Sequence, residues 1–195
     1  MTRLLLLRHA DHDLVGRALA GRGDTPLNAH GREQASALVG RLAPHDIHAL
    51  YSSPRPRAQQ TIAPLATARG LHIATAPEFD EVDFGEWTGL SFEHLREHGG
   101  EAWRIWCERR GSAQPPGGEP FTQVAARAWA GFERLRDAHP DQCVLVVSHG
   151  DVLRALVATV LGMSLDDLER FEVAPAAISI VDAVGGWAQL RQLNA

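Results

Sequence analysis

The stretch Leu4-Leu5-Leu6-Leu7-Arg8-His9 decides how this chain folds. Four consecutive leucines are typical of a strand that is buried on both faces, as in a parallel sheet covered by helices. The run ends abruptly in a cation and an imidazole, which need water, a partner or a ligand. In an open α/β sheet, ligands bind at the carboxyl ends of the strands. The stretch therefore predicts a buried strand over residues 3–8 with a binding site directly after it.

The same pattern recurs downstream, where the apolar residues 143–147 are followed by Ser148-His149-Gly150. Short apolar runs alternate with segments of helical spacing between the two. The predicted strands are 3–8, 47–52, 71–74 and 143–148, the predicted helices are 28–42, 57–69, 121–138 and 151–161, and a C-terminal hairpin is predicted from 177–182 and 188–193. This order predicts an α/β fold, a three-layer sandwich with a mostly parallel central sheet flanked by helices.

Residues 1–195 are predicted to form a single domain, since 195 residues is the size of one ordinary domain. Its least regular part is an excursion at about 78–120, which contains three of the five tryptophans and a loop rich in proline and glycine. We expect the excursion to hold one or two helices and to cover the site.

The composition excludes several classes of protein. A net charge of −5 argues against a broad basic face for nucleic acid or an anionic membrane. The two cysteines form no CxxC pair, so neither a zinc site nor a disulfide framework is indicated. No stretch approaches the roughly 18 apolar residues of a membrane span, and the first apolar run is too short for a signal peptide. We expect a cytoplasmic protein, and the sequence leaves its oligomeric state open.

Right-handed crossovers bring the loops after parallel strands to one edge of the sheet. We therefore expect Arg8-His9, the Ser52-Ser53-Pro54 turn and His149-Gly150 to share one rim. Predicted helices begin just after the last two segments, and helix N-termini favour anions. With arginines beside them, these groups suit a dianion such as a phosphate group. No serine or cysteine nucleophile adjoins the histidine, so the imidazole itself is the candidate nucleophile.

Five segments together resemble the motifs of the histidine phosphatase (phosphoglycerate mutase-like) superfamily, in its small phosphatase branch. In chain order they are Arg8-His9 after the leucine strand, Gly23-Asp24-Thr25-Pro26-Leu27 with Gly31 and Gln34-Ala35, residues 52–61 (SSPRPRAQQT), residues 81–89 (EVDFGEWTG) and Ser148-His149-Gly150. They occur in the family's order and cover most of the chain.

The resemblance implies the family's fold and a role for each matching residue. His9 would be the nucleophile that becomes phosphohistidine, and Arg8, Arg57 and His149 would hold the phosphoryl oxygens. Glu81 would protonate the leaving oxygen and then activate water. The motif selects Arg57 over Arg55, and it selects Glu81 over the other acids of its loop, which are Glu78, Asp83 and Glu86.

The chain departs from the family pattern directly after the nucleophile. Ala10 replaces the family's glycine, and Asp11-His12 replaces its Glu-Thr or Glu-Ser pair. Val15 replaces an asparagine that helps to hold phosphate in the family. We expect His12 or Arg17 to supply the missing donor.

These observations predict a metal-independent phosphomonoester hydrolase that acts through phosphohistidine on a small phosphorylated metabolite. No cofactor and no metal are expected. The pair His94 and His98 has a metal-binding spacing, but it lacks a third ligand. One alternative is phosphoryl transfer of the phosphoglycerate mutase type. The family's mutases are longer in the middle, so the compact excursion of this chain favours access of water. Another alternative is a phosphoryl-binding module without turnover, which the departures at Ala10, His12 and Val15 would support.

Overall fold

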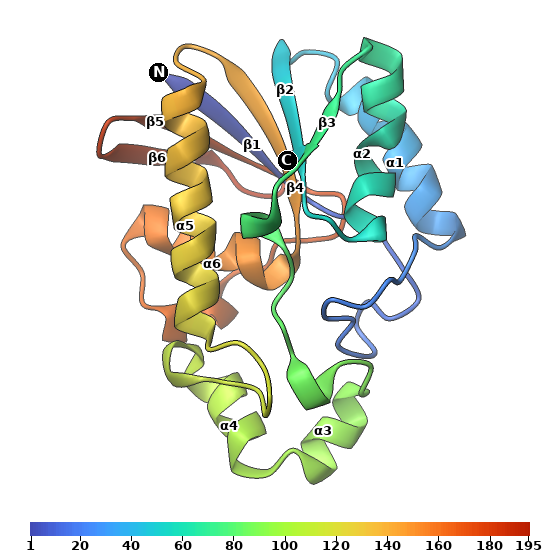
Figure 1. The fold of residues 1–195 in the computed structure, drawn as a ribbon, viewed down its shortest axis with the longest axis vertical. Coiled ribbons are helices and arrows are strands. Elements are labelled where there is room, and N and C mark those ends of the chain that lie inside the picture. The colour runs from blue at the N-terminus through green and yellow to red at the C-terminus, as the bar shows by residue number, and fades with distance from the viewer.

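The core of the molecule is a six-stranded sheet with the strand order β3-β2-β4-β1-β5-β6, seen in a computed structural model that describes residues 1–195 (Figure 1). The strands are β1 (Thr2–Arg8), β2 (Ile47–Ser52), β3 (Ile73–Thr75), β4 (Cys143–Ser148), β5 (Ile178–Val184) and β6 (Trp187–Gln192). The first four strands are parallel to one another, whereas β5 pairs antiparallel with β1 and with β6. The predicted α/β fold with a mostly parallel sheet is therefore confirmed, as is the C-terminal hairpin.

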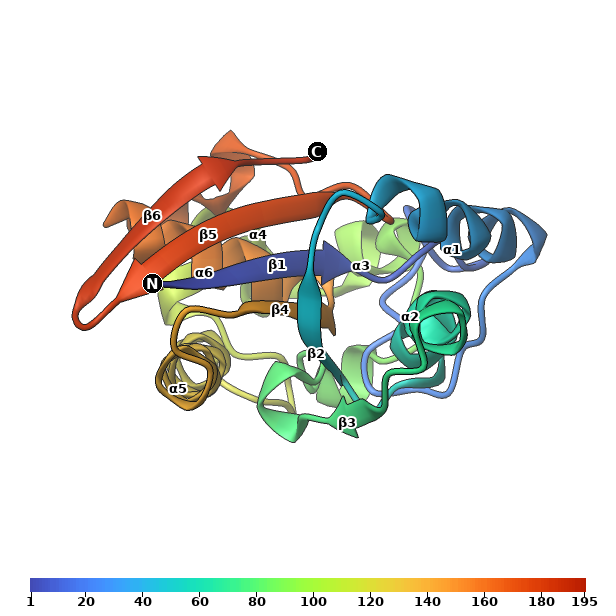
Figure 2. The ribbon, with the colours of Figure 1, turned by 90° about the horizontal axis from the view of Figure 1, so that it is seen from above.

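Helices cover both faces of this sheet. They are α1 (Ala29–Arg41), α2 (Pro56–Arg69), α3 (Phe92–His98), α4 (Gly100–Glu108), α5 (Phe121–Ala138) and α6 (Gly150–Leu161). Viewed from above, α1 and α2 lie on one side of the sheet and α5 on the other (Figure 2). None of the helices combines the length and the apolar character that crossing a membrane requires.

The leucine run of β1 packs against both helical layers. Leu4 and Leu6 belong to the apolar cluster that includes residues of α5 and α6, whereas Leu5 and Leu7 belong to the cluster of α1 and α2. All four side chains are fully buried, and burying each contributes about 1.5–3 kcal/mol to folding. The alternation explains why the run has no polar position: a strand between two helical layers has no face in water.

The helix ends are fixed by local capping residues. The side chain of Asn28 caps α1 by accepting a hydrogen bond from the backbone N–H of Gly31. Gly70 ends α2 in the left-handed conformation with φ +63°, and Gly162 ends α6 in the same way. The predicted strand at 71–74 begins later, at Ile73, because the backbone N–H of Leu71 completes the end of α2 by binding Ala66 O at 3.0 Å.

The segment between β3 and α5 lies beyond the carboxyl ends of the strands, with α3 and α4 at the lower end of Figure 1. It also contains three short 3-10 helices, which are Pro77–Phe79, Gly85–Trp87 and Arg110–Ser112. Aromatic side chains hold it together: the rings of Trp87 and Trp106 meet edge to face at 6.0 Å, and Phe84 and Phe121 contact Trp106 in the same way. Such edge-to-face packing fixes the relative position of the elements.

Candidate active site

Three strands end at the same level of the sheet. Arg8 at the end of β1 pairs with Ser148 at the end of β4, and Ser52 at the end of β2 pairs with Val147. The residues that follow these ends therefore share one rim, as predicted. Helices α2 and α6 begin at this rim, so their free backbone N–H groups lie beside it.

His9 is held as a neutral imidazole with one free nitrogen. Its backbone N–H donates to Ser148 O at 2.9 Å, and its Nδ1 lies 2.8 Å from the carbonyl oxygen of Ala10. Because a carbonyl only accepts, Nδ1 carries the proton and Nε2 presents its lone pair. Burial holds the pKa of His9 well below its usual value, and the positive charges of Arg57 and Arg8 lower it further. This is the form that a nucleophilic imidazole needs.

Two guanidinium groups stand beside His9, those of the fully buried Arg57 and the half-buried Arg8. Arg57, in the first turn of α2, is fully buried and donates to Gly21 O at 2.7 Å and to Gly23 O at 3.1 Å. Arg8 donates to Val173 O at 2.6 Å. Burial lowers the pKa of both arginines, and the charge of Glu81 opposes this in each case. Both remain cations, since guanidinium does not lose its proton in proteins.

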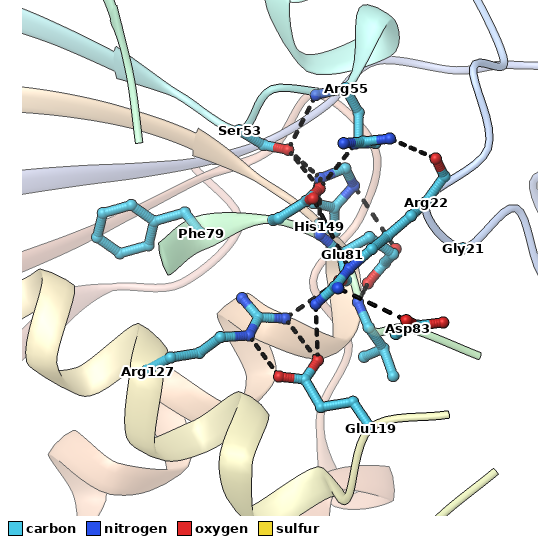
Figure 3. A network of polar contacts seen from close by, with 12 residues as sticks. Gly21, Arg22, Ser53, Arg55, Phe79, Glu81, Asp83, Glu119, Arg127 and His149 are labelled. Atoms are coloured by element: carbon cyan, nitrogen blue, oxygen red, sulfur yellow. Dashed lines mark hydrogen bonds and ion pairs between the residues drawn. The ribbon is translucent and has the colours of Figure 1, made fainter. Parts of the chain in front are cut away.

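A directed chain of hydrogen bonds orients His149, which is also fully buried. Its Nε2 lies 2.7 Å from Ser53 Oγ, and Ser53 in turn donates to the carboxylate of Asp80 at 3.2 Å. Because the serine proton goes to Asp80, the serine oxygen accepts from His149, so Nε2 carries the proton of the neutral ring. Figure 3 shows His149 and Ser53 within this network. Burial and the charge of Arg57 keep the pKa of His149 well below its usual value.

Four buried nitrogen atoms in this region have no hydrogen-bond partner: Nε of Arg8, Nε of Arg55, Nε of Arg57 and Nδ1 of His149. Of these, Nε of Arg55 lies 3.0 Å from the carboxylate of Asp80, which balances its charge. Leaving a buried polar group unpaired costs about 1–3 kcal/mol, and more when the group is charged. Unpaired guanidinium donors next to a free imidazole nitrogen fit a ligand with several strong acceptor oxygens.

The carboxyl group of Glu81 lies among these atoms. Its Oε2 is 3.5 Å from Nδ1 of His149 and 3.7 Å from Nη2 of Arg57. Burial raises the pKa of Glu81 to about 7, and the charge of Arg57 offsets only part of this effect. At neutral pH the group can therefore both donate and accept a proton.

The other acids of the same loop serve elsewhere. Glu78 forms an ion pair with Arg134 on α5, and Asp83 accepts from the backbone N–H of Gly85. Glu86 is exposed. Of the four acids weighed from the sequence, Glu81 is the one that lines the cavity beside His9.

His12 and Arg17 are the two residues predicted to replace the missing phosphate donor, and the structure brings only His12 to the site. His12 is buried, and the centre of its ring lies 5.0 Å from that of His9. Its Nδ1 accepts from the backbone N–H of Leu14, so Nε2 carries the proton, and burial lowers its pKa to about 4. Arg17 is exposed and does not line the cavity, so the structure does not bring it to the site. Val15 does line the cavity.

Sequence reasoning missed a surrounding shell of charged groups (Figure 3). The carbonyl oxygen of Glu81 accepts from Arg22 and from Arg127, each at 3.1 Å, and both arginines bind Glu119. These hydrogen bonds hold the backbone of Glu81 from outside the site. The sequence position of Arg127 could have indicated this contact. Arg127 follows the buried Val124 by three residues, so both lie on the same face of the amphipathic helix α5.

The site suits an anion better than a metal ion. Ligand atoms of His9, Glu81 and His149 lie within 4.8 Å of one another, a spacing that a metal ion could use. However, Arg57 lies 3.7 Å from the carboxylate of this group, and Arg8 adds a second cation that lowers the pKa of His9. Charges of this sign repel a divalent cation and attract a dianion.

An open cavity of about 680 Å³ leads from His9 outward. Its floor contains Arg8, His9, His12 and Glu81, and its walls come from the loop after β1, from Phe92 on α3 and from the segment before β5. The volume is that of a pocket for a small molecule.

The model of the histidine phosphatase superfamily (branch 1) matches residues 4–195. The chain is 32% identical over 193 residues to an adenosylcobalamin/alpha-ribazole phosphatase of Escherichia coli, covering 98% of this chain and 95% of that protein. It is 32% identical over 183 residues to phosphoserine phosphatase 1 of Hydrogenobacter thermophilus, covering 93% and 86%. Other curated relatives, from Mycobacterium, are 37% identical, and the chain spans about half of their length (54%).

A solved structure, that of a mycobacterial glucosyl-3-phosphoglycerate phosphatase, superposes with a TM-score of 0.89 at 28% identity. The match covers 99% of this chain and 98% of that one. Sequence motifs, fold and the convergence of two histidines with two arginines agree with one another. The chain belongs to the histidine phosphatase superfamily, branch 1.

Proposed function

We propose that this chain is a phosphomonoester hydrolase that acts through a phosphohistidine at Nε2 of His9. The observation that carries the proposal is the pair of unpaired buried guanidinium nitrogens on Arg8 and Arg57, beside the neutral imidazole of His9, whose Nε2 has a free lone pair. The named relatives support it, since phosphatases of phosphoserine, alpha-ribazole phosphate and glucosyl-3-phosphoglycerate are among them.

In the first step, Nε2 of His9 attacks the phosphorus atom and the bond to the leaving oxygen breaks. Glu81 gives its proton to that oxygen, which leaves as an alcohol. Arg8 and Arg57 hold the equatorial oxygens, where charge is concentrated during transfer. His149 joins them once binding of the dianion has added a proton to its Nδ1, because a neighbouring negative charge favours the imidazolium form. The Nδ1–H of His9 keeps its bond to the Ala10 carbonyl, which stabilises the positive ring of the phosphohistidine.

In the second step, the Glu81 carboxylate takes a proton from water as the water oxygen attacks phosphorus. The N–P bond breaks, its electron pair returns to Nε2 of His9, and inorganic phosphate leaves. Glu81 is then protonated for the next cycle. A pKa of about 7 lets one group perform both proton transfers.

The test is hydrolysis of p-nitrophenyl phosphate in the presence of EDTA, by the wild type and by His9→Ala. We expect turnover by the wild type, and a phosphorylated protein intermediate that is labile in acid and stable in base. His9→Ala should lose at least about a thousandfold in kcat, whereas the control His45→Ala should retain activity because His45 does not line the cavity. Near-normal activity of His9→Ala would refute the phosphohistidine.

The two alternatives give different results in the same assay. A non-catalytic module would bind inorganic phosphate with no turnover by the wild type. A mutase would transfer the phosphoryl group from the phosphoenzyme to an added phosphoglycerate faster than to water.

A further inference from the structure

The cavity beyond His9 has apolar walls that are partly uncovered. Leu14 and Val15 come from the loop after β1, Phe92 from α3 and Phe171 from the segment before β5, and each of these side chains is partly exposed. Because they face the space that a leaving group would fill, an apolar surface on that group would gain about 25 cal/mol for each Å² it covers.

The basic groups along these walls are neutralised. Arg154 lies 3.3 Å from a Glu169 oxygen and 3.9 Å from an Asp151 oxygen, and it donates to Phe171 O at 3.0 Å. Arg110, just behind, binds the same two carboxylates at 2.9 and 3.2 Å. The charges of the two arginines and the two carboxylates therefore cancel. The guanidinium N–H groups point at these carboxylates rather than into the cavity.

The outer end of the cavity is left with a negative charge. Arg170 is paired with Asp167 at 2.7 Å, whereas the carboxylate of Glu172 is exposed and has no hydrogen bond or ion pair. The field of Glu172 reaches the floor, where it partly offsets the lowering of the Arg8 pKa by burial. The exposed arginines Arg17 and Arg96 do not line this cavity. Beyond the phosphate end, the two lining arginines, Arg154 and Arg170, are each already paired with a carboxylate.

We propose that the leaving group of the substrate is an uncharged or cationic alcohol with an apolar face, and that this cavity disfavours phosphomonoesters with a second anionic group close to the ester. The inference rests on the proposed hydrolase function and narrows its substrate class. It also argues against a phosphorylated hydroxy acid, since the carboxylate of such a molecule would meet the unpaired carboxylate of Glu172 and only arginines that already have carboxylate partners.

The test compares three aryl phosphates: phenyl phosphate, 4-carboxyphenyl phosphate and 4-(aminomethyl)phenyl phosphate. The carboxylate makes the phenol no poorer as a leaving group, so slower turnover would report on the cavity. We expect kcat/KM for the carboxylated ester to be about tenfold below that of phenyl phosphate, and the aminomethyl ester to equal or exceed phenyl phosphate. In Glu172→Gln, the ratio of kcat/KM for phenyl phosphate to that for the carboxylated ester should fall to about threefold. Added salt should lower the same ratio in the wild type. Glu33→Gln, which removes an exposed acid on α1, should leave it unchanged.

The outcomes separate this inference from the function on which it rests. If the phenyl ester is hydrolysed and the carboxylated ester is equally good, the leaving-group inference is wrong and the hydrolase remains. An unchanged ratio in Glu172→Gln would overturn the inference in the same way. If none of the three esters is hydrolysed, both the function and the inference fail.

Discussion

The two ends of the active-site cavity are built in different ways. At the phosphate end, Arg8, His9, Arg57 and His149 follow strand ends or begin a helix, and their hydrogen bonds go to backbone carbonyls or to buried side chains. At the leaving-group end, the walls come from the loop after β1, from α3 and from the segment before β5, and most of their side chains are partly or fully exposed, as at Glu172.

The two ends of the cavity therefore have different roles, one in the chemistry and one in the choice of substrate. A group fixed by the core can hold a transition state without reorganising, whereas a wall made of loops can change its side chains at little cost to folding. Changes at the phosphate end should therefore slow every substrate alike. Changes at the leaving-group end should alter the ranking of substrates.

The largest loss of kcat/KM is expected for Arg57→Ala, and Arg154→Ala provides the comparison at the other end of the cavity. Arg57 is fully buried and has one unpaired nitrogen beside the proposed phosphoryl site, so its loss should lower kcat/KM about a thousandfold for every ester. Arg154 is bound by carboxylates and a carbonyl, so its loss should change kcat/KM by less than about tenfold and by different factors for different esters. Steady-state kinetics on the three aryl phosphates measures both.

Circular dichroism and the midpoint of urea unfolding serve as controls, because Arg57 also binds Gly21 and Gly23. Arg57→Lys keeps a charge but not the fork of donors, and it should recover only part of the activity. Equal losses in Arg57→Ala and Arg154→Ala would mean that the two ends do not differ as described.

The phosphate end could be predicted from the sequence because its signals are local. An apolar strand that ends in Arg8-His9, and another that ends in Ser148-His149, place both histidines at the rim through the parallel register alone. The helix caps at Asn28 and Gly70 are equally local. Short-range rules of this kind do not depend on the rest of the chain.

The rest depends on contacts between distant segments, which no local pattern encodes. Asp80 meets Ser53 across 27 residues and Arg22 meets Glu119 across 97. Whether Arg17 would reach the cavity depended on the turn that carries it, and this turn leaves the side chain exposed. The cancellation of charge around Arg154 likewise required the fold.

A smaller effect, about a hundredfold, is expected for Glu81→Gln with esters of poor leaving groups. For p-nitrophenyl phosphate the loss should be less, since its leaving oxygen needs no proton. Because burial raises the pKa of Glu81 to about 7, the acid form declines as pH rises through 7. The wild-type kcat for a poor leaving group should therefore fall above pH 7, and this alkaline limb should vanish in Glu81→Gln. An unchanged limb in the variant would assign the titration to another group.

The smallest effect, a loss of about tenfold in kcat/KM, is expected for Asp80→Asn. This variant tests whether the hydrogen bonds at the phosphate end also fix which nitrogen of His149 carries the proton. In the wild type Asp80 only accepts, so Ser53 accepts from Nε2–H of His149. An amide at position 80 can donate to Ser53, whose hydroxyl can then donate to Nε2, and the imidazole proton moves to Nδ1.

That proton would point at the Glu81 carboxyl, 3.5 Å away, and would favour its ionised form. The alkaline limb should therefore move to lower pH in Asp80→Asn, and nitrogen-15 NMR should report a change from the Nε2-protonated to the Nδ1-protonated ring of His149. Asp83→Asn is the control, since Asp83 has no contact with Ser53. A purely structural role for Asp80 would lower stability without moving either the limb or the tautomer. In that case the fixed end of the cavity would depend on its backbone contacts alone.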